Sequence, residues 1–117
     1  FDSHGPYALV VPDGSAAQEA QRILPASTVV AAFHHLSAPR LEDPVTDSFD
    51  EDVLVLGEDR TAVNVVIDLV GSALPGGRGV YAGRLRNAHQ VEALTANLIA
   101  VNRRYKARAG LRVTGLR

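Results

Sequence analysis

A long, almost uncharged stretch near the end of the chain is the strongest constraint on its fold. Between Val91 and Val101 the only charged residue is Glu92, and apolar residues fall on every side of a helical wheel. We expect a helix capped by Asn87 that runs to about Ala107 and ends in cations, which suit the negative end of a helix dipole. A helix that is apolar all round must be covered all round. A small domain covers only one face of it, so we expect a second subunit or a further domain to cover the rest.

Two shorter helices are expected earlier in the chain. Ser15 and Gln18 have the spacing of a capping box, and Pro25 ends the helix that follows them. Asp59 is expected to cap a second helix, which ends before Pro75. The apolar stripe of this second helix consists of Ala62, Val63, Val66, Ile67, Val70 and Leu74.

Apolar runs between these helices indicate strands. The runs 28–33 and 53–57 are rich in β-branched residues and are typical of strands buried on both faces, as in parallel sheets. A weaker strand is expected at 78–82 and an edge strand at 111–113. The fold class is therefore α/β: a small sheet of three to four mainly parallel strands packed with helices, including the long apolar C-terminal helix. Residues 1–13 are interpreted as a linker-like segment and 14–117 as one domain.

Composition excludes several classes of protein. With 46% hydrophobic residues, the 117-residue chain has enough apolar content for a core. It has no cysteine, which removes disulfides and thiolate metal sites, and its four histidines lack zinc-ligand spacing, so no metal is expected. No run is apolar enough for a membrane span and no leader opens the chain, so a cytoplasmic protein is expected.

Charge is unevenly distributed along the chain. Residues 1–59 hold 11 acids and 2 arginines, whereas residues 60–117 hold 2 acids and 10 bases. Pairing between the two halves, within one molecule or across a dimer, is favoured over an anionic ligand or nucleic acid. A nucleic-acid partner is not expected, because Tyr105 is the only stacking residue in the basic C-terminal cluster.

The candidate chemistry centres on two adjacent histidines. The chain has no hydrolase motif and no phosphate-binding glycine loop between a strand and a helix. His34 and His35 follow an expected buried strand at its carboxyl end, where open α/β sheets bind ligands. On position alone, a ligand site and an ordinary polar loop are equally supported. Thr95, Asn97 and Asn102 lie on the apolar helix, and each needs a hydrogen-bond partner wherever it is buried.

Several segments, in their order and spacing, resemble the C-terminal part of NADPH-dependent coenzyme F420 reductases. The resemblance spans about residues 14–116. It is carried by Ser15-Ala16-Ala17, Val29-Val30-Ala31-Ala32-Phe33-His34, the Val-x-Gly-x-Asp run ending at Asp59, Ala82-Gly83-x-Leu85-x-Asn87-Ala88-x-x-Val91-Glu92-x-Leu94-Thr95, Asn102-Arg103-Arg104-Tyr105 and Ala109-Gly110-Leu111-Arg112-x-Thr114-Gly115. Proteins of this family transfer a hydride between NADP and the deazaflavin of coenzyme F420.

The resemblance implies that two domains bind the two cofactors. An N-terminal Rossmann domain, absent from residues 1–117, would hold NADP(H), and a homodimer would be common. This chain would contribute the deazaflavin-binding part, with no catalytic acid or base, because hydride transfer needs none. As an isolated chain it would be inactive. The alternative is a non-catalytic dimerisation or binding module that reuses the same half-fold.

The resemblance also implies which residues bind the cofactor. His34 matches a histidine that lines the deazaflavin site, and His35 and Leu36 follow it in the same loop. Thr95 matches a threonine near that site, and His89 falls where relatives often have Arg. Three further positions depart from the family pattern: Tyr81, Arg84 and Ala93 stand where Asp, Pro and, in some relatives, Ser are found.

Overall fold

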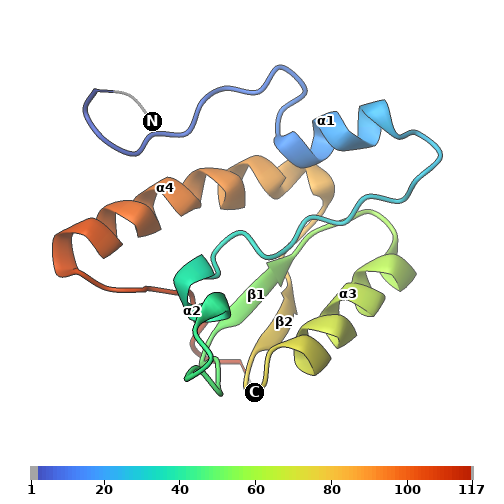
Figure 1. Cartoon of the computed structure of the whole chain (residues 1–117). Helices are drawn as coiled ribbons and strands as arrows, with labels where there is room; N and C mark the ends of the chain where they lie inside the picture. The colour runs from blue at the N-terminus through green and yellow to red at the C-terminus, as the bar shows by residue number, and fades with distance from the viewer. Residues whose placement is uncertain (1–2, 117) are drawn as a thin grey trace.

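The computed structural model describes residues 3–116 as one α/β unit (Figure 1). The elements in chain order are α1 (Ala16–Ile23), α2 (Ala38–Glu42), β1 (Asp52–Val55), α3 (Arg60–Ala73), β2 (Arg78–Tyr81), the 3₁₀ turn η1 (Leu85–Asn87) and α4 (Ala88–Tyr105). The α/β class is confirmed, and so are the three expected helices. The five-residue helix α2 was not expected. None of the helices among residues 3–116 is long and apolar enough to cross a membrane.

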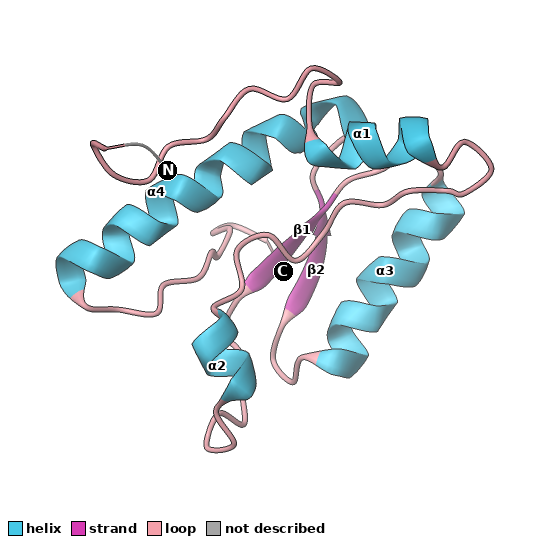
Figure 2. Ribbon diagram, turned by 45° about the horizontal axis from the view of Figure 1, so that its top comes forward, coloured by secondary structure: helices cyan, strands magenta, loops and turns pink. Residues whose placement is uncertain are grey.

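The sheet consists of β1 and β2, which pair in parallel from Asp52 opposite Arg78 to Val55 opposite Tyr81. Helix α3 connects the two strands and packs against both of them (Figure 2). Side chains alternate along β1, so its two faces contribute to two clusters. One cluster contains Phe49, Val53, Val55, Val63, Val70 and Leu74, and the other contains Ala31, Leu56, Leu85, Ala88 and Val91.

The expected strand at 28–33 is wrong as a regular strand. Its contact with the sheet is one antiparallel bridge, in which Ala31 and Leu56 exchange hydrogen bonds of 2.8 and 2.9 Å. Phe33 then takes a positive φ of 67°, a conformation that ends an extended run. The described residues therefore form a two-stranded sheet, not one of three to four strands. At 111–113, a single backbone bond from Asp52 N to Leu111 O replaces the expected edge strand.

Two of the three predicted side-chain caps form at the starts of the helices, and the third does not. Ser15 Oγ accepts a hydrogen bond from Gln18 N at 3.1 Å, and Asp59 Oδ1 accepts one from Ala62 N at 2.9 Å, as expected. Asn87 makes no such bond to α4, so the prediction that it caps the helix is wrong. The turn η1 leads directly into α4 and already holds Asn87 in a helical conformation. A side-chain cap needs extended backbone at that position, which η1 does not leave.

The long helix is only partly covered. In α4 only Ala88 and Val91 are buried, and Val101 is exposed. Helix α1 has no buried residue, and Ile23 and Leu24 are exposed, so the apolar side chains at its end are not covered by residues 3–116. The N-terminal segment runs alongside α4 without a regular element (Figure 1), with hollows of about 580 and 390 Å³ beneath it.

The carboxylate of Glu92 joins α4 to α1. Its two oxygens accept hydrogen bonds from Ala16 N at 2.7 Å and Ala17 N at 3.2 Å. These are the first two amides of α1, which have no partner inside their own helix. A negative charge at this end of a helix also complements its dipole. The one acid in the nearly uncharged stretch of the long helix therefore holds a second helix in place.

The charged halves of the chain pair with each other within one molecule. Asp52 accepts two bonds of 2.7 Å from Arg78, and Asp50 pairs with Arg112. Asp52 also accepts from Val113 N at 2.8 Å, which fastens the C-terminal segment to β1. A Cβ at Gly110 would overlap the carboxyl group of Glu51, so this segment lies against the strand with no room for a side chain there. The interpretation of the charge asymmetry as internal pairing is supported.

Substitution Asp52→Asn should lower the free energy of unfolding at pH 7 by about 3 kcal/mol, because it removes the charge of a buried ion pair. The hydrogen bonds from Arg78 hold the pKa of Asp52 below its ordinary value. The stabilisation is therefore complete above about pH 4 and is lost as the pH falls through the lowered pKa. Urea denaturation at several pH values measures this difference.

The matched control for this prediction is Asp50→Asn, since the side chain of Asp50 is 87% exposed. We expect it to cost less than about 1 kcal/mol. Equal effects of the two substitutions, or a difference that grows in acid, would contradict the assignment.

Substitution Glu92→Gln should lower the free energy of unfolding by about 1 kcal/mol and speed amide exchange at Ala16 and Ala17, because the charge at the start of α1 is removed. Hydrogen-exchange NMR measures both amides directly. Asp68→Asn, an exposed acid on α3, serves as the control and should leave them unchanged. Unchanged exchange in Glu92→Gln would show that the carboxylate charge does not hold α1.

Candidate functional site

Four of the five residues expected to bind the cofactor line one hollow. The lining includes His34, His35, Leu36 and Thr95. The space measures about 60 Å³ and lies between the loop before α2 and the C-terminal half of α4. Ser37, Leu98, Ile99, Asn102 and Ala109 complete its lining. Residues 61 positions apart in the sequence, His34 and Thr95, therefore belong to one site.

Hydrogen bonds to α4 fasten this loop. The buried ring of His35 places Nε2 2.8 Å from Val91 O, so Nε2 carries the proton and donates it. Thr95 Oγ1 lies 3.2 Å from His34 O and 3.4 Å from Val91 O, and its single hydrogen is shared between them. Thr95 thus bonds both to the loop and back to its own helix. Asn97 is exposed, and Asn102 Oδ1 accepts from Ala109 N at 2.7 Å.

His34 differs from His35 in having an unsatisfied nitrogen. Its Nδ1 is buried and has no hydrogen-bond partner among residues 3–116. Burial lowers the pKa of His34, and the neighbouring His35 lowers it further, while Glu92 opposes the shift. The ring is therefore neutral near pH 7, with one nitrogen ready to bond to a group that is not part of this chain.

The backbone just before His34 is strained. Phe33 has a φ of 67°, which is uncommon for a residue with a side chain, and its ring is 39% exposed. Such conformations cost about 1–3 kcal/mol and persist where surrounding contacts hold them. Here the bond from His35 to Val91 O and the bond from Thr95 to His34 O fasten the residues that follow to α4.

His89 lies apart from the other four residues. It is exposed on the first turn of α4, and its Nδ1 is 2.9 Å from Arg86 O. It borders the hollow of about 580 Å³ beneath residues 8–11. The structure therefore does not bring His89 into the site of His34.

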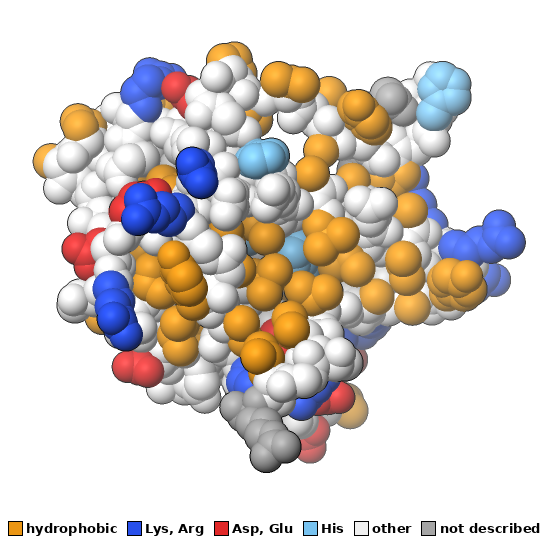
Figure 3. Space-filling model, turned by 180° about the vertical axis from the view of Figure 1, so that it is seen from behind, with side chains coloured by type: hydrophobic (Ala, Val, Ile, Leu, Met, Phe, Trp, Pro, Cys, Tyr) orange, Lys and Arg blue, Asp and Glu red, His pale blue; other side chains and the backbone are white. Residues whose placement is uncertain are grey.

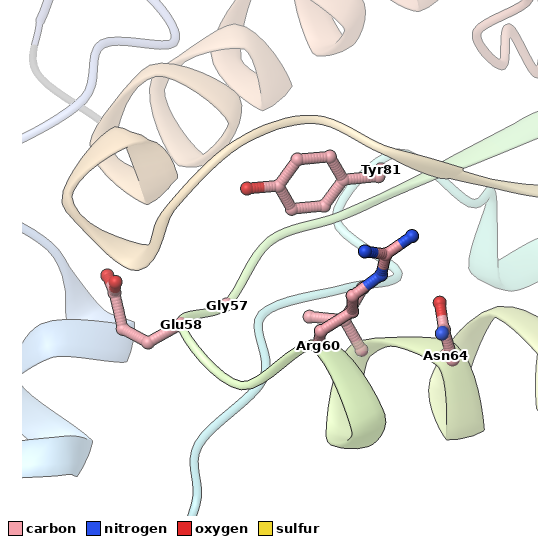
Figure 4. Close-up of a pocket in the computed structure, with 6 residues that line it drawn as sticks. Gly57, Glu58, Arg60, Asn64 and Tyr81 are labelled. Carbon is pink, nitrogen blue, oxygen red and sulfur yellow. The ribbon is translucent and has the colours of Figure 1, made fainter.

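The expected position of His34 at the carboxyl edge of the parallel strands is wrong. Because the bridge between Ala31 and Leu56 is antiparallel, the chain runs from Ala31 towards the amino end of β1. The carboxyl ends of β1 and β2 border a different hollow of about 400 Å³ (Figure 4), which sequence reasoning missed. We name it the carboxyl-edge hollow; its lining is Gly57, Glu58, Arg60, Val63, Asn64 and Tyr81. The signal that points to it is the end of each strand, where ligands of parallel sheets bind.

The His34 hollow is too small to enclose a cofactor by itself. Sites for small ligands measure about 300–1,000 Å³, several times the 60 Å³ found here. Seen from behind, apolar side chains spread across an open area of the surface, with a histidine among them (Figure 3). The chain thus presents one wall of a site and leaves the facing side open. In the part of the chain that the structure describes, no group of three His, Asp or Glu side chains is placed to hold a metal ion.

The lowered pKa of His34 should be visible by NMR. Its ring protons should titrate with a midpoint below the ordinary histidine value of about 6.5. Because the folded state binds this proton less readily than the unfolded state, stability should fall as the pH drops below about 6.5. His34→Asn should remove that part of the pH dependence in urea denaturation. A midpoint at or above the ordinary value would contradict the described burial of the ring.

The chain is similar in sequence to known proteins. No family model matches the chain. It is 40% identical over 109 residues, or 92% of its length, to an F420-dependent NADP reductase of Methanocaldococcus jannaschii. Corresponding reductases of Methanothermobacter marburgensis and Methanothermobacter thermautotrophicus are 37% and 38% identical over 89% of the chain.

The chain spans about half the length of these curated relatives: 48%, 47% and 45%. This coverage is consistent with one domain of a two-domain protein. The resemblance expected from the sequence motifs is confirmed: the chain is a relative of the F420-dependent NADP reductases and corresponds to about half of such a protein.

Proposed function

We propose that the chain is the C-terminal, deazaflavin-binding and dimerisation part of an oxidoreductase that transfers a hydride between NADPH and coenzyme F420. One observation carries the proposal: four of the five residues that the family resemblance assigns to the cofactor site line one hollow, in which His34 Nδ1 has no partner among residues 3–116. The names of the relatives supply the two cofactors.

Each residue of the hollow has a distinct proposed role. His34 hydrogen-bonds the deazaflavin through Nδ1, and Leu36 packs against the face of the ring. His35 and Thr95 position the loop through their bonds to Val91 O and His34 O. His89 is proposed as a separate cofactor contact, since it borders the larger hollow nearer the start of α4.

The chemistry of hydride transfer suits a site with no acid or base. A bound deazaflavin would supply a ring carbon that exchanges a hydride directly with the nicotinamide. The protein has to hold the two rings in contact and exclude water. The neutral ring of His34 and the apolar side chains of Leu36, Leu98 and Ile99 are suited to that task, because they add no charge to the hollow.

The open side of the hollow requires a second surface. We propose that an N-terminal Rossmann domain covers it and holds NADP(H), and that a homodimer covers further exposed apolar side chains of α1 and α4. On this proposal the isolated chain is inactive and the full protein is cytoplasmic. The extent of the uncovered apolar surface supports it, since monomeric proteins rarely leave large contiguous apolar patches exposed.

The proposal predicts how coenzyme F420 binds. Joined to the NADP-binding half of the Methanocaldococcus jannaschii relative, the chain should quench coenzyme F420 fluorescence and catalyse hydride transfer to NADP, while the chain alone should do neither. His34→Ala should weaken coenzyme binding roughly tenfold, since it removes one hydrogen bond in a dry site. Fluorescence titration and reduction kinetics measure the two effects.

Asn97→Ala is the matched control, because Asn97 is exposed on the same helix outside the hollow. It should leave both measurements unchanged. Unaltered binding and kinetics in His34→Ala would refute the role of His34. Dimerisation with no coenzyme binding by the joined protein would instead favour a non-catalytic module.

A further inference from the structure

We propose that the carboxyl-edge hollow is a second binding site, for a small planar anion: an aromatic ring that carries a carboxylate or phosphate at one end and a hydrogen-bond donor at the other. The hollow measures about 400 Å³, which is within the range of sites for small ligands. It lies at the carboxyl ends of β1 and β2 and beside the first turns of α3, away from His34.

An arginine without a partner supplies the positive end of this site. No hydrogen bond or ion pair to the side chain of Arg60 is found within residues 3–116, and the same holds for Arg86 and Arg104, whereas Arg22, Arg40, Arg78, Arg84, Arg108 and Arg112 are paired with acids. Asn64 lies one helical turn further along α3, on the same side as Arg60 (Figure 4). A planar guanidinium with an amide beside it is well suited to a carboxylate or a phosphate.

Tyr81 supplies a face for a planar ring. Tyr81 is the last residue of β2 and is 55% exposed, and its ring borders the hollow (Figure 4). Aromatic rings stack on such faces in offset arrangements. Val63, which is buried, forms the apolar floor of the hollow together with the backbone of Gly57. A Cβ at Gly57 would lie 2.9 Å from Val63 Cγ2, so the floor is closely packed.

Glu58 sets the orientation of the ligand. Its Oε1 accepts a hydrogen bond from Leu85 N at 3.1 Å, and its Oε2 lies 3.9 Å from Arg84 Nε. These contacts hold the carboxylate towards the loop before η1, at the other end of the hollow from Asn64 (Figure 4). Arg84 offsets part of this charge, and Oε2, which accepts no hydrogen bond from a backbone amide, is available to a donor on the ligand. The acidic group of a ligand therefore lies beside Arg60, and a hydroxyl or amino group lies beside Glu58.

The test is an NMR titration of the chain with 4-aminobenzoate and with adenosine 5′-monophosphate, two probes that share this chemistry but differ in their acidic group. We expect saturable shifts of the amides at 57–64 and 81–82 with at least one of them, and the better probe identifies the acid. Arg60→Gln should weaken binding about tenfold, because a charge-assisted pair is lost. Tyr81→Ala should weaken binding of the same probe.

Two further variants test whether binding is specific to the carboxyl-edge hollow. Arg104→Gln removes an exposed cation at the far end of α4 and should leave the affinity unchanged, as should His34→Ala, which alters the proposed deazaflavin site. No saturable shift with either probe would overturn the proposal. So would an affinity insensitive to Arg60→Gln or Tyr81→Ala, or one that His34→Ala weakens. None of these results tests coenzyme F420 binding. The failure of this proposal can therefore be distinguished from the failure of the proposed function.

Discussion

One short stretch of α4, from Val91 to Thr95, holds the candidate deazaflavin site together. Val91 O accepts the hydrogen bond of His35, Glu92 binds the first amides of α1, and Thr95 bonds the backbone of His34. Two separate parts of the chain, the loop at 34–35 and helix α1, are therefore positioned by little more than one helical turn. The strained backbone at Phe33 is retained because the loop that follows it is fastened on this helix.

The sequence predicts those features that depend on neighbouring residues. Ser15 and Asp59 cap their helices as expected, because a cap is decided within one turn. The run 28–33 does not form the expected strand, although its β-branched residues favour one, since strand formation depends on a partner elsewhere in the chain. The antiparallel direction of its one bridge is likewise not encoded in the run, and it moves His34 to the opposite edge of the sheet.

The resemblance, and not periodicity, predicts that these residues belong to one site. On helical spacing alone, Thr95 is one more residue of an apolar helix, and nothing in the spacing connects it to His34. The structure brings the two together but leaves His89 outside, because His89 lies on the first turn of α4, nearly two turns before Thr95. A motif that is continuous in sequence can thus contribute to two separate surfaces of one helix.

The incomplete cover of α4 and the incomplete His34 hollow have one physical cause. A two-stranded sheet and its helices bury only Ala88 and Val91 of the long helix, so the same helix that positions the histidine loop also leaves its apolar side chains open. A surface that covers the side of α4 formed by Thr95, Leu98 and Ile99 also closes the His34 hollow, in which the buried Nδ1 has no partner among residues 3–116. Under the proposed function, a domain that covers this side of α4 therefore also completes the cofactor site, to which this chain contributes one side.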